Sequence, residues 1–160
     1  MDASFTAEEH FRRGEEALAE GRADGALDHF GAAHRLDPTS ARYRSYYGLA
    51  LGLVERRLDR ALELCRSAAR EEFFQPAHYH NLARLHLAFG FKAEAIRYLR
   101  RGLMIDPENE AIGEELRRLG IRRRPPLAFL RRRNFLNRWI GRVLSRAPGA
   151  PEPELTPFGI

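Results

Sequence analysis

The sequence is short of the residues that build covalent and catalytic sites. Cys65 is the only cysteine among the 160 residues, which excludes an internal disulfide and a cysteine-based metal cluster. No glycine-rich phosphate loop and no Ser or Cys nucleophile motif occurs. His78 and His80 would point to different sides of one helix, and neither these two nor His86 has a carboxylate or thiol at a supporting metal-ligand spacing. We therefore expect no enzyme, no metal and no cofactor.

Long apolar runs are also missing. No uninterrupted stretch approaches the roughly 20 apolar residues of a membrane-spanning helix. Residues 1–5 are acidic and lack the basic start and apolar run of a secretory signal. The single cysteine fits a reducing compartment. These observations predict a cytoplasmic location.

The net charge of +5 is unevenly distributed. Residues 1–120 hold 18 Lys and Arg against 20 Asp and Glu, whereas residues 121–160 hold nine Arg against Glu152 and Glu154. The body is thus near neutral and the C-terminal segment strongly basic. A basic segment of this kind can bind an anionic surface of protein, lipid or nucleic acid.

The chain contains an internal repeat of about 34 residues. A shift of 69 residues, about two units, superposes five pairs in order: Gly21 with Gly90, Ala26 with Ala95, Phe30 with Leu99, Asp37 with Asp106 and Pro38 with Pro107. A middle unit lies halfway, because Gly48 follows Gly14 by 34 residues and Ala61 lies between Ala26 and Ala95. Three units are therefore expected.

Residues 6 to about 119 resemble the tetratricopeptide repeat (TPR) family, in which Leu-Gly, an aromatic, Ala, Phe and Pro recur at set spacings. The residues that carry the resemblance are Gly14, Ala17, Gly21, Ala26, Phe30, Ala33 and Pro38; Tyr47, Gly48, Leu51, Ala61, Cys65, Ala68 and Pro76; and Tyr79, Leu82, Ala83, His86, Gly90, Ala95, Leu99, Gly102 and Pro107. The resemblance implies an all-α fold, a right-handed α-solenoid of three helix pairs that binds a protein partner.

The spacing predicts helix pairs at 6–20 with 23–36, 40–54 with 58–70, and 76–89 with 92–105, followed by a capping helix over 107–119. Small residues such as Gly14 and Gly48 would let paired helices approach, and Phe30 would fill the space beside them. Gly21 and Gly90 should end helices in the left-handed conformation. Pro38 and Pro107 are expected within the first turn of the following helix.

In this family the first helix of each pair lines a concave groove that selects the ligand. If the register holds, this groove is largely apolar and contains Phe11, Glu15, Leu18, Tyr46, Leu49, Leu53, His80, Asn81, Arg84 and Leu87. Phe11 and Tyr46 are the expected anchors for an amphipathic helix or an extended peptide. The alternative is that these two aromatics pack between neighbouring helices, and burial distinguishes the two interpretations.

Chaperone-docking members of the family bind a C-terminal carboxylate with Lys, Asn and Arg side chains. Here Phe11, Glu15, Tyr46, Ala77 and Asn81 occupy those places, so the carboxylate clamp is absent. In length and repeat number the chain also resembles the secretion chaperones of the family, although its arginine-rich C-terminal segment departs from them.

After Gly120 the composition changes to an Arg- and Pro-rich linker over 121–133. A basic amphipathic helix is predicted over 134–147, and a proline-rich extended tail over 148–160. The helix would carry an apolar half and basic residues on the other half. The residues of interest in it are Phe135, Leu136, Arg138, Trp139, Ile140, Arg142, Val143 and Leu144.

Three interpretations of the 134–147 helix are open. It could pack on its own array, contact a partner protein, including a second copy of the chain, or bind an anionic membrane surface. Nucleic acid is the least expected partner, because no nucleic-acid-binding fold is recognised. The sequence therefore favours an adaptor for a protein or peptide, with a surface tether or a secretion-type chaperone as alternatives.

Overall fold

The computed structural model describes residues 5–120, which form seven α-helices and no strand. The helices are α1 (Ala7–Ala19), α2 (Ala23–Leu36), α3 (Ala41–Val54), α4 (Leu58–Glu71), α5 (Pro76–Ala88), α6 (Lys92–Ile105) and α7 (Glu110–Arg118). The seven helices predicted for residues 6–119 are confirmed, and their predicted bounds differ from the observed ones by at most three residues. None of these helices is both long and apolar enough to cross a membrane.

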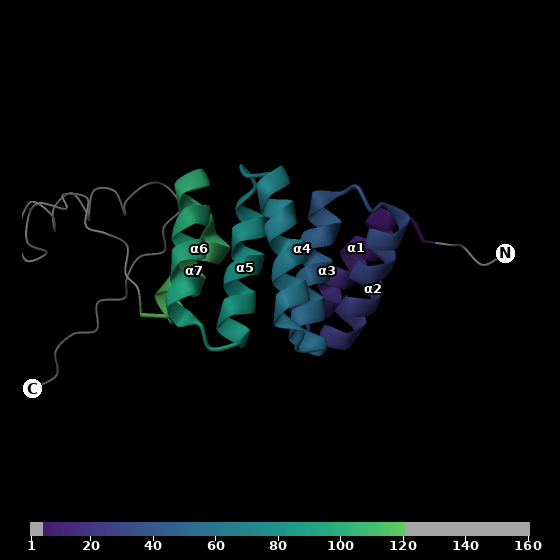
Figure 1. The fold of residues 1–160 in the computed structure, drawn as a ribbon, viewed down its shortest axis with the longest axis horizontal. Helices are drawn as coiled ribbons and strands as arrows, with labels where there is room; N and C mark the ends of the chain where they lie inside the picture. Colours follow the sequence, from purple (N-terminus) through teal and green to yellow (C-terminus); the bar gives the residue numbers. More distant parts are fainter. Residues whose placement is uncertain (1–4, 121–160) are drawn as a thin grey trace, which may run out of the picture. The chain divides into compact units, whose positions relative to one another are not determined.

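The helices pack as successive hairpins. α1 pairs with α2, α3 with α4, and α5 with α6, and each hairpin stacks on the next, as Figure 1 shows. The last helix, α7, packs against α6 and covers the end of the described array. Such a stack buries a continuous apolar seam that no single hairpin could bury alone.

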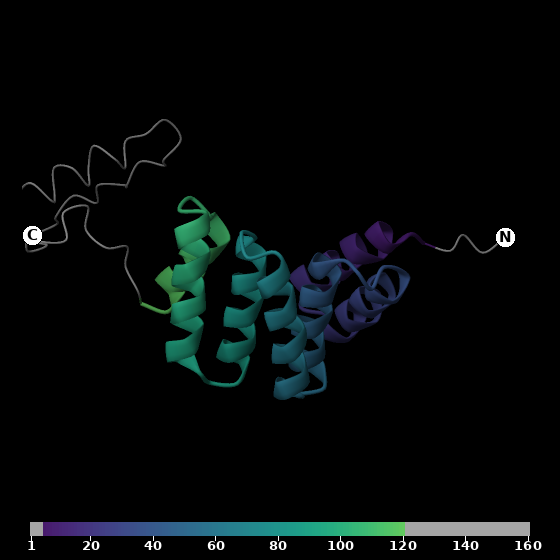
Figure 2. The ribbon, with the colours of Figure 1, turned by 45° about the horizontal axis from the view of Figure 1, so that its top comes forward.

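The first helices of successive hairpins contact one another, α1 with α3 through the Phe11 and Tyr43 rings. The helix α3 packs directly against α5, whereas among the described helices α4 and α6 have at most a marginal contact. We call α1, α3 and α5 the inner row, and α2, α4 and α6 the outer row; both can be followed in Figure 2. The inner row therefore presents one surface built from the first helix of each pair.

The expected packing of small residues against large ones is confirmed. Phe30 is 0% exposed and lies directly over Gly14, where an added Cβ would come within 2.5 Å of the Phe30 ring. Gly48 brings α3 close to α4, since a Cβ there would lie 3.0 Å from the Ala61 carbonyl oxygen. Ala26, Ala61, Ala83 and Ala95 are also fully buried. The small residues that recur in each repeat thus allow the helices to approach closely.

The first helix begins with a capping box. The Glu9 backbone N–H donates to the Thr6 hydroxyl at 3.2 Å, and the Thr6 N–H donates to the Glu9 carboxylate at 2.7 Å. Gly21 and Gly90 follow α1 and α5 with φ of +77° and +83°, as expected for left-handed helix ends. In the middle repeat Arg56 takes this conformation with φ of +59°.

Pro38 and Pro107 were expected inside the following helices, and this prediction is wrong. They lie in turns before α3 and α7, whose N-caps are Ser40 and Asn109. The carboxylate of Asp37 accepts the Thr39 backbone N–H at 3.1 Å, and this bond holds the turn. Before α7 the Asp106 carboxylate likewise accepts the Glu108 backbone N–H, at 3.2 Å. The aspartate before each proline therefore shapes a turn, and the helix begins only after a second capping residue.

Cys65 fills the position that Phe30 and Leu99 hold in the other repeats, and it is fully buried. Its thiol donates to the Ser45 carbonyl at 3.1 Å, and burial raises its pKa to about 12. The reactive thiolate is thus scarce at neutral pH.

We expect a thiol reagent to label native Cys65 at least about 100-fold more slowly than the urea-unfolded chain. Absorbance of the released chromophore would measure both rates. Equal rates in the two conditions would contradict the buried position.

The predicted linker, basic amphipathic helix and proline-rich tail fall at 121–160, outside the described residues. Phe135, Trp139 and the basic residues around them therefore stay a prediction from sequence.

Candidate functional site

The inner row contains a hollow of about 290 Å³ between α1, α3 and the start of α5. We call it the inner hollow. Its lining residues are Phe11, Glu15, Arg42, Tyr46, Glu72, Gln75, Ala77 and His78. Three helices and the loop before α5 contribute, so the site exists only when the first two repeats and the third are stacked.

An aromatic cluster forms the floor of the inner hollow. The Phe11 ring packs against Phe30, Tyr43 and Tyr46 with centroid distances of 5.5, 5.3 and 4.9 Å. Phe11 is only 3% exposed, whereas Tyr46 is half-buried. Burial thus favours packing for Phe11 and leaves Tyr46 as the aromatic side chain that a ligand can reach.

One edge of the inner hollow is a charged network. Arg42 forms an ion pair with Glu8, and the Tyr43 hydroxyl donates to the same carboxylate at 2.8 Å. The Arg42 guanidinium also lies 4.3 Å from the centroid of the Phe11 ring. These contacts join α1 to α3 and hold the cation over the aromatic floor.

At the opposite edge His78 is buried, and its Nε2 lies 2.9 Å from the Glu72 carboxylate. The pair ties the start of α5 to the end of α4. The acidic groups on both edges, Glu8 and Glu72, therefore have partners within the protein.

Glu15 differs from these two acidic groups. Its side chain is exposed at the inner hollow, and within the described part of the chain it forms no ion pair. Partial burial of its carboxyl raises the pKa, although Arg42 opposes this effect. Burial likewise raises the pKa of the neighbouring Tyr46, and the negative charge of Glu15 adds to the shift. A ligand cation would relieve this unbalanced negative charge.

Further along the inner row, His80 on α5 lies 3.2 Å from the Glu115 carboxylate on α7. Burial lowers the pKa of His80, and the bond to Glu115 opposes that shift. Arg84 follows one turn later, and its half-buried guanidinium has a pKa below the ordinary value because of desolvation. This end of the row is therefore polar.

Two of the predicted groove residues belong to the interior. Leu49 is fully buried in the core between α3, α4 and α5. Asn81 is also buried, and its side-chain amide donates to the Ser45 hydroxyl at 3.1 Å. The bond pins α5 to α3 and fixes the spacing of the inner row.

The structure thus divides the ten groove residues predicted from sequence. Glu15 is exposed, and six side chains are partly buried: Leu18, Tyr46, Leu53, His80, Arg84 and Leu87. Phe11, Leu49 and Asn81 are buried. Of the ten, Phe11, Glu15 and Tyr46 line the inner hollow.

Sequence reasoning missed Arg42 and His78. Arg42 stands one turn before Tyr46, and this spacing is the signal that could have revealed it. His78 was considered only as a metal ligand, and no sequence pattern links it to Glu72 in the turn after α4.

These observations define the class of protein: an α-solenoid of helix hairpins with a mixed aromatic and charged hollow on its inner row. Comparison with solved structures shows that the fold is that of a TPR domain. The similarity covers about 72% of this chain at 16–20% sequence identity.

Three such structures illustrate the similarity. The first TPR of Spaghetti (RPAP3) bound to the HSP90 peptide SRMEEVD matches with a TM-score of 0.56 and 20% identity, over 72% of this chain and 93% of that one. The Arabidopsis OM64 TPR domain matches at 0.55 and 19%, over 71% and 93%. YrrB, a TPR protein with an unusual peptide-binding site, matches at 0.56 and 16%, over 72% of this chain and 59% of its own length.

No protein-family model and no curated protein sequence matches this chain. The fold is therefore recognised through structure.

Proposed function

We propose that this protein is an adaptor that binds a peptide segment of a partner protein along the inner row, with the inner hollow as the main contact. The observation that carries the proposal is the Glu15 carboxylate, which has no ion-pair partner within residues 5–120, beside the half-buried Tyr46 ring. An aromatic surface next to an unbalanced charge is typical of a peptide anchor site. The TPR structures of RPAP3 and YrrB, whose titles name a bound peptide and a peptide-binding site, support this use of the fold.

The charges around the inner hollow indicate which peptides fit. Arg42 is paired with Glu8 and Glu72 has His78 as a hydrogen-bond partner, whereas within residues 5–120 the Glu15 carboxylate has no such partner. A Lys or Arg of the ligand would pair with Glu15. An apolar side chain next to it would cover Tyr46, Leu18 and Leu53, which are partly buried on the inner row. We infer an extended or helical peptide that carries a basic residue beside an apolar one.

The same charges disfavour an acidic C-terminal peptide. Glu15 and Ala77 stand where chaperone-docking relatives of the fold place carboxylate-binding side chains, and both line the inner hollow. A terminal carboxylate there would face the negative Glu15, and the guanidinium that lines the hollow, Arg42, is already paired with Glu8. The proposed ligand therefore differs from SRMEEVD.

Selection from a random peptide library on the full-length chain, followed by calorimetry of the enriched peptides, tests the proposal. We expect enriched peptides to carry Lys or Arg beside an apolar residue and to lose about tenfold in affinity for Glu15→Gln. The matched control is Glu16→Gln, which removes an exposed carboxylate of the same helix outside the inner hollow and should leave affinity unchanged. SRMEEVD serves as the negative probe.

Equal loss in the Glu15 and Glu16 variants, or tight binding of SRMEEVD, would overturn the proposal. Circular dichroism melting of each variant confirms that the array is folded. Glu15 is exposed, so its replacement by an uncharged isostere should not change the melting temperature.

A further inference from the structure

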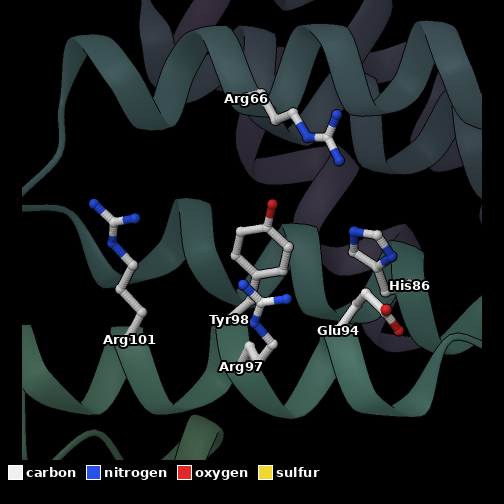
Figure 3. A pocket seen from close by; sticks show the side chains of 6 residues that line it. All are labelled: Arg66, His86, Glu94, Arg97, Tyr98 and Arg101. Carbon is white, nitrogen blue, oxygen red and sulfur yellow. The ribbon is translucent and has the colours of Figure 1, made fainter.

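A second pocket lies between helices α4, α5 and α6. It has a volume of about 310 Å³ and is lined by Arg66, His86, Glu94, Arg97, Tyr98 and Arg101. We call it the arginine pocket. Figure 3 shows Arg66 extending from one helix toward Tyr98 and His86, with Arg97 and Arg101 on the facing helix. The pocket shares no residue with the inner hollow.

The three arginines of the pocket have no charged partner in the described part of the chain. Within residues 5–120, Arg66, Arg97 and Arg101 take part in no ion pair and no side-chain hydrogen bond. The Arg101 guanidinium lies 5.0 Å from the centroid of the Tyr79 ring. Arg97 and Arg101 are also one turn apart on α6, where like charges repel. Holding these cations together is unfavourable unless an anion joins them.

His86 provides an independent observation. It is only 5% exposed, yet neither ring nitrogen has a hydrogen-bond partner in the described part of the chain. Its ring stacks on Tyr98 with a centroid distance of 5.3 Å and an interplanar angle of 18°. The stacking fixes the ring at the pocket wall and leaves its N–H without an acceptor. Buried polar groups are normally satisfied, so an unpartnered ring N–H at this pocket favours binding of a group that accepts a hydrogen bond.

The charge of the pocket indicates the ligand. Three guanidinium groups and the Glu94 carboxylate sum to two positive charges when His86 is neutral. Burial lowers the pKa of His86, Arg66 lowers it further, and Glu94 opposes the shift, so the neutral ring is favoured. A neutral imidazole keeps one N–H donor. Two net positive charges and forked donors on two helices match a dianion with several oxygens.

We propose that the arginine pocket binds a dianionic phosphate group, held by Arg66, Arg97 and Arg101 with the His86 N–H as a further donor. A single carboxylate would be satisfied by one guanidinium and would leave the others uncompensated. Such a group can come from free phosphate or from a phosphorylated side chain of a partner. The pocket thus adds an anion-binding surface to the outer helices, separate from the proposed peptide site.

Titration of the full-length chain with inorganic phosphate at constant ionic strength, followed by NMR of the His86 ring, tests the proposal. The ring signals report on this pocket even if the arginines of 121–160 also attract phosphate. We expect saturable shifts and a rise in the His86 pKa once the anion is bound, since a nearby negative charge favours the imidazolium. The variants Arg97→Gln and Arg66→Gln should each bind phosphate at least tenfold more weakly.

The matched control is Arg100→Gln. Arg100 is exposed on the same helix, between Arg97 and Arg101, but does not line the pocket. A loss as large in this variant as in Arg97→Gln would overturn the proposal, and so would shifts that chloride reproduces at equal ionic strength. All three arginines are exposed, so melting curves of the variants should match wild type.

Binding of three probes distinguishes free phosphate from a phosphorylated side chain as the source of the anion. The probes are a short peptide with phosphoserine, the same peptide without the phosphate, and inorganic phosphate. Tighter binding of the phosphopeptide than of inorganic phosphate supports a phosphorylated side chain, and equal binding supports the free anion. Equal binding of both peptides, with no response to inorganic phosphate, contradicts the site. A failure here leaves the Glu15 experiment unaffected, because the two sites share no residue.

Discussion

Replacing Phe30 with alanine is expected to lower the free energy of unfolding by about 3–5 kcal/mol. The Phe30 side chain is fully buried between α1 and α3, where it packs against Phe11 and Tyr46 and lies over Gly14. Glycine offers no atoms that could move into the space left by the ring. Because the whole stability of a small domain is about 5–15 kcal/mol, this single change should remove a large part of it. Urea unfolding followed by circular dichroism measures the loss.

The control for this prediction is Phe73→Ala. Phe73 is 66% exposed in the loop between α4 and α5, so its truncation should change stability by no more than about 0.5 kcal/mol. If both phenylalanine variants lost the same stability, the assignment of Phe30 to the packing layer would be wrong.

The second large effect is expected for Gly48→Ala, with a loss of about 1–3 kcal/mol. A Cβ at this position would lie 2.9 Å from both the Leu64 Cβ and the Cys65 sulfur, and 3.0 Å from the Ala61 carbonyl oxygen. Two of these three atoms belong to the rigid part of α4, so relief requires the helices α3 and α4 to move apart. Thermal and urea unfolding of the variant measure the cost.

Gly25→Ala is the matched control, since it is the same substitution inside another helix. An added Cβ there meets only the flexible Arg22 guanidinium at 3.4 Å and the Ala17 Cβ at 3.7 Å. Alanine restricts the unfolded chain and favours the helix, so this variant should gain roughly 0.5–1 kcal/mol. Stabilisation by both substitutions would show that α3 and α4 are not in close contact at Gly48.

The internal repeat made it possible to predict the fold from the sequence. In such an array each unit packs only on its neighbours, so the same small and large residues recur at the same spacing. Gly21 and Gly90 confirm this at the helix ends, and Phe30 and Leu99 confirm it in the core. The prolines were misplaced because a proline fits both a turn and a first helical turn. Only the aspartate side chain before each proline decides between them.

The candidate sites could be predicted from the sequence only in part. Helical periodicity correctly put Phe11, Glu15 and Tyr46 near one surface, yet it could not tell which side chains a neighbouring helix covers. Phe11 is buried because α2 and α3 both pack on it, whereas Glu15 one turn later is exposed. The arginine pocket could not be predicted from the sequence, because Arg66 and His86 lie on different helices and come together only in the folded protein. Long-range proximity leaves no local pattern in a single sequence.

The sequence by itself determined the number of helices up to Gly120, their turns and the residues that let them approach, because these depend on local conformation and on residue size. The tertiary structure alone decided which charges are paired, which aromatic ring is open to a ligand and where arginines from separate helices meet. Pairing and burial depend on atoms brought together from distant positions, and a charged side chain looks the same in sequence whether or not its partner is within reach.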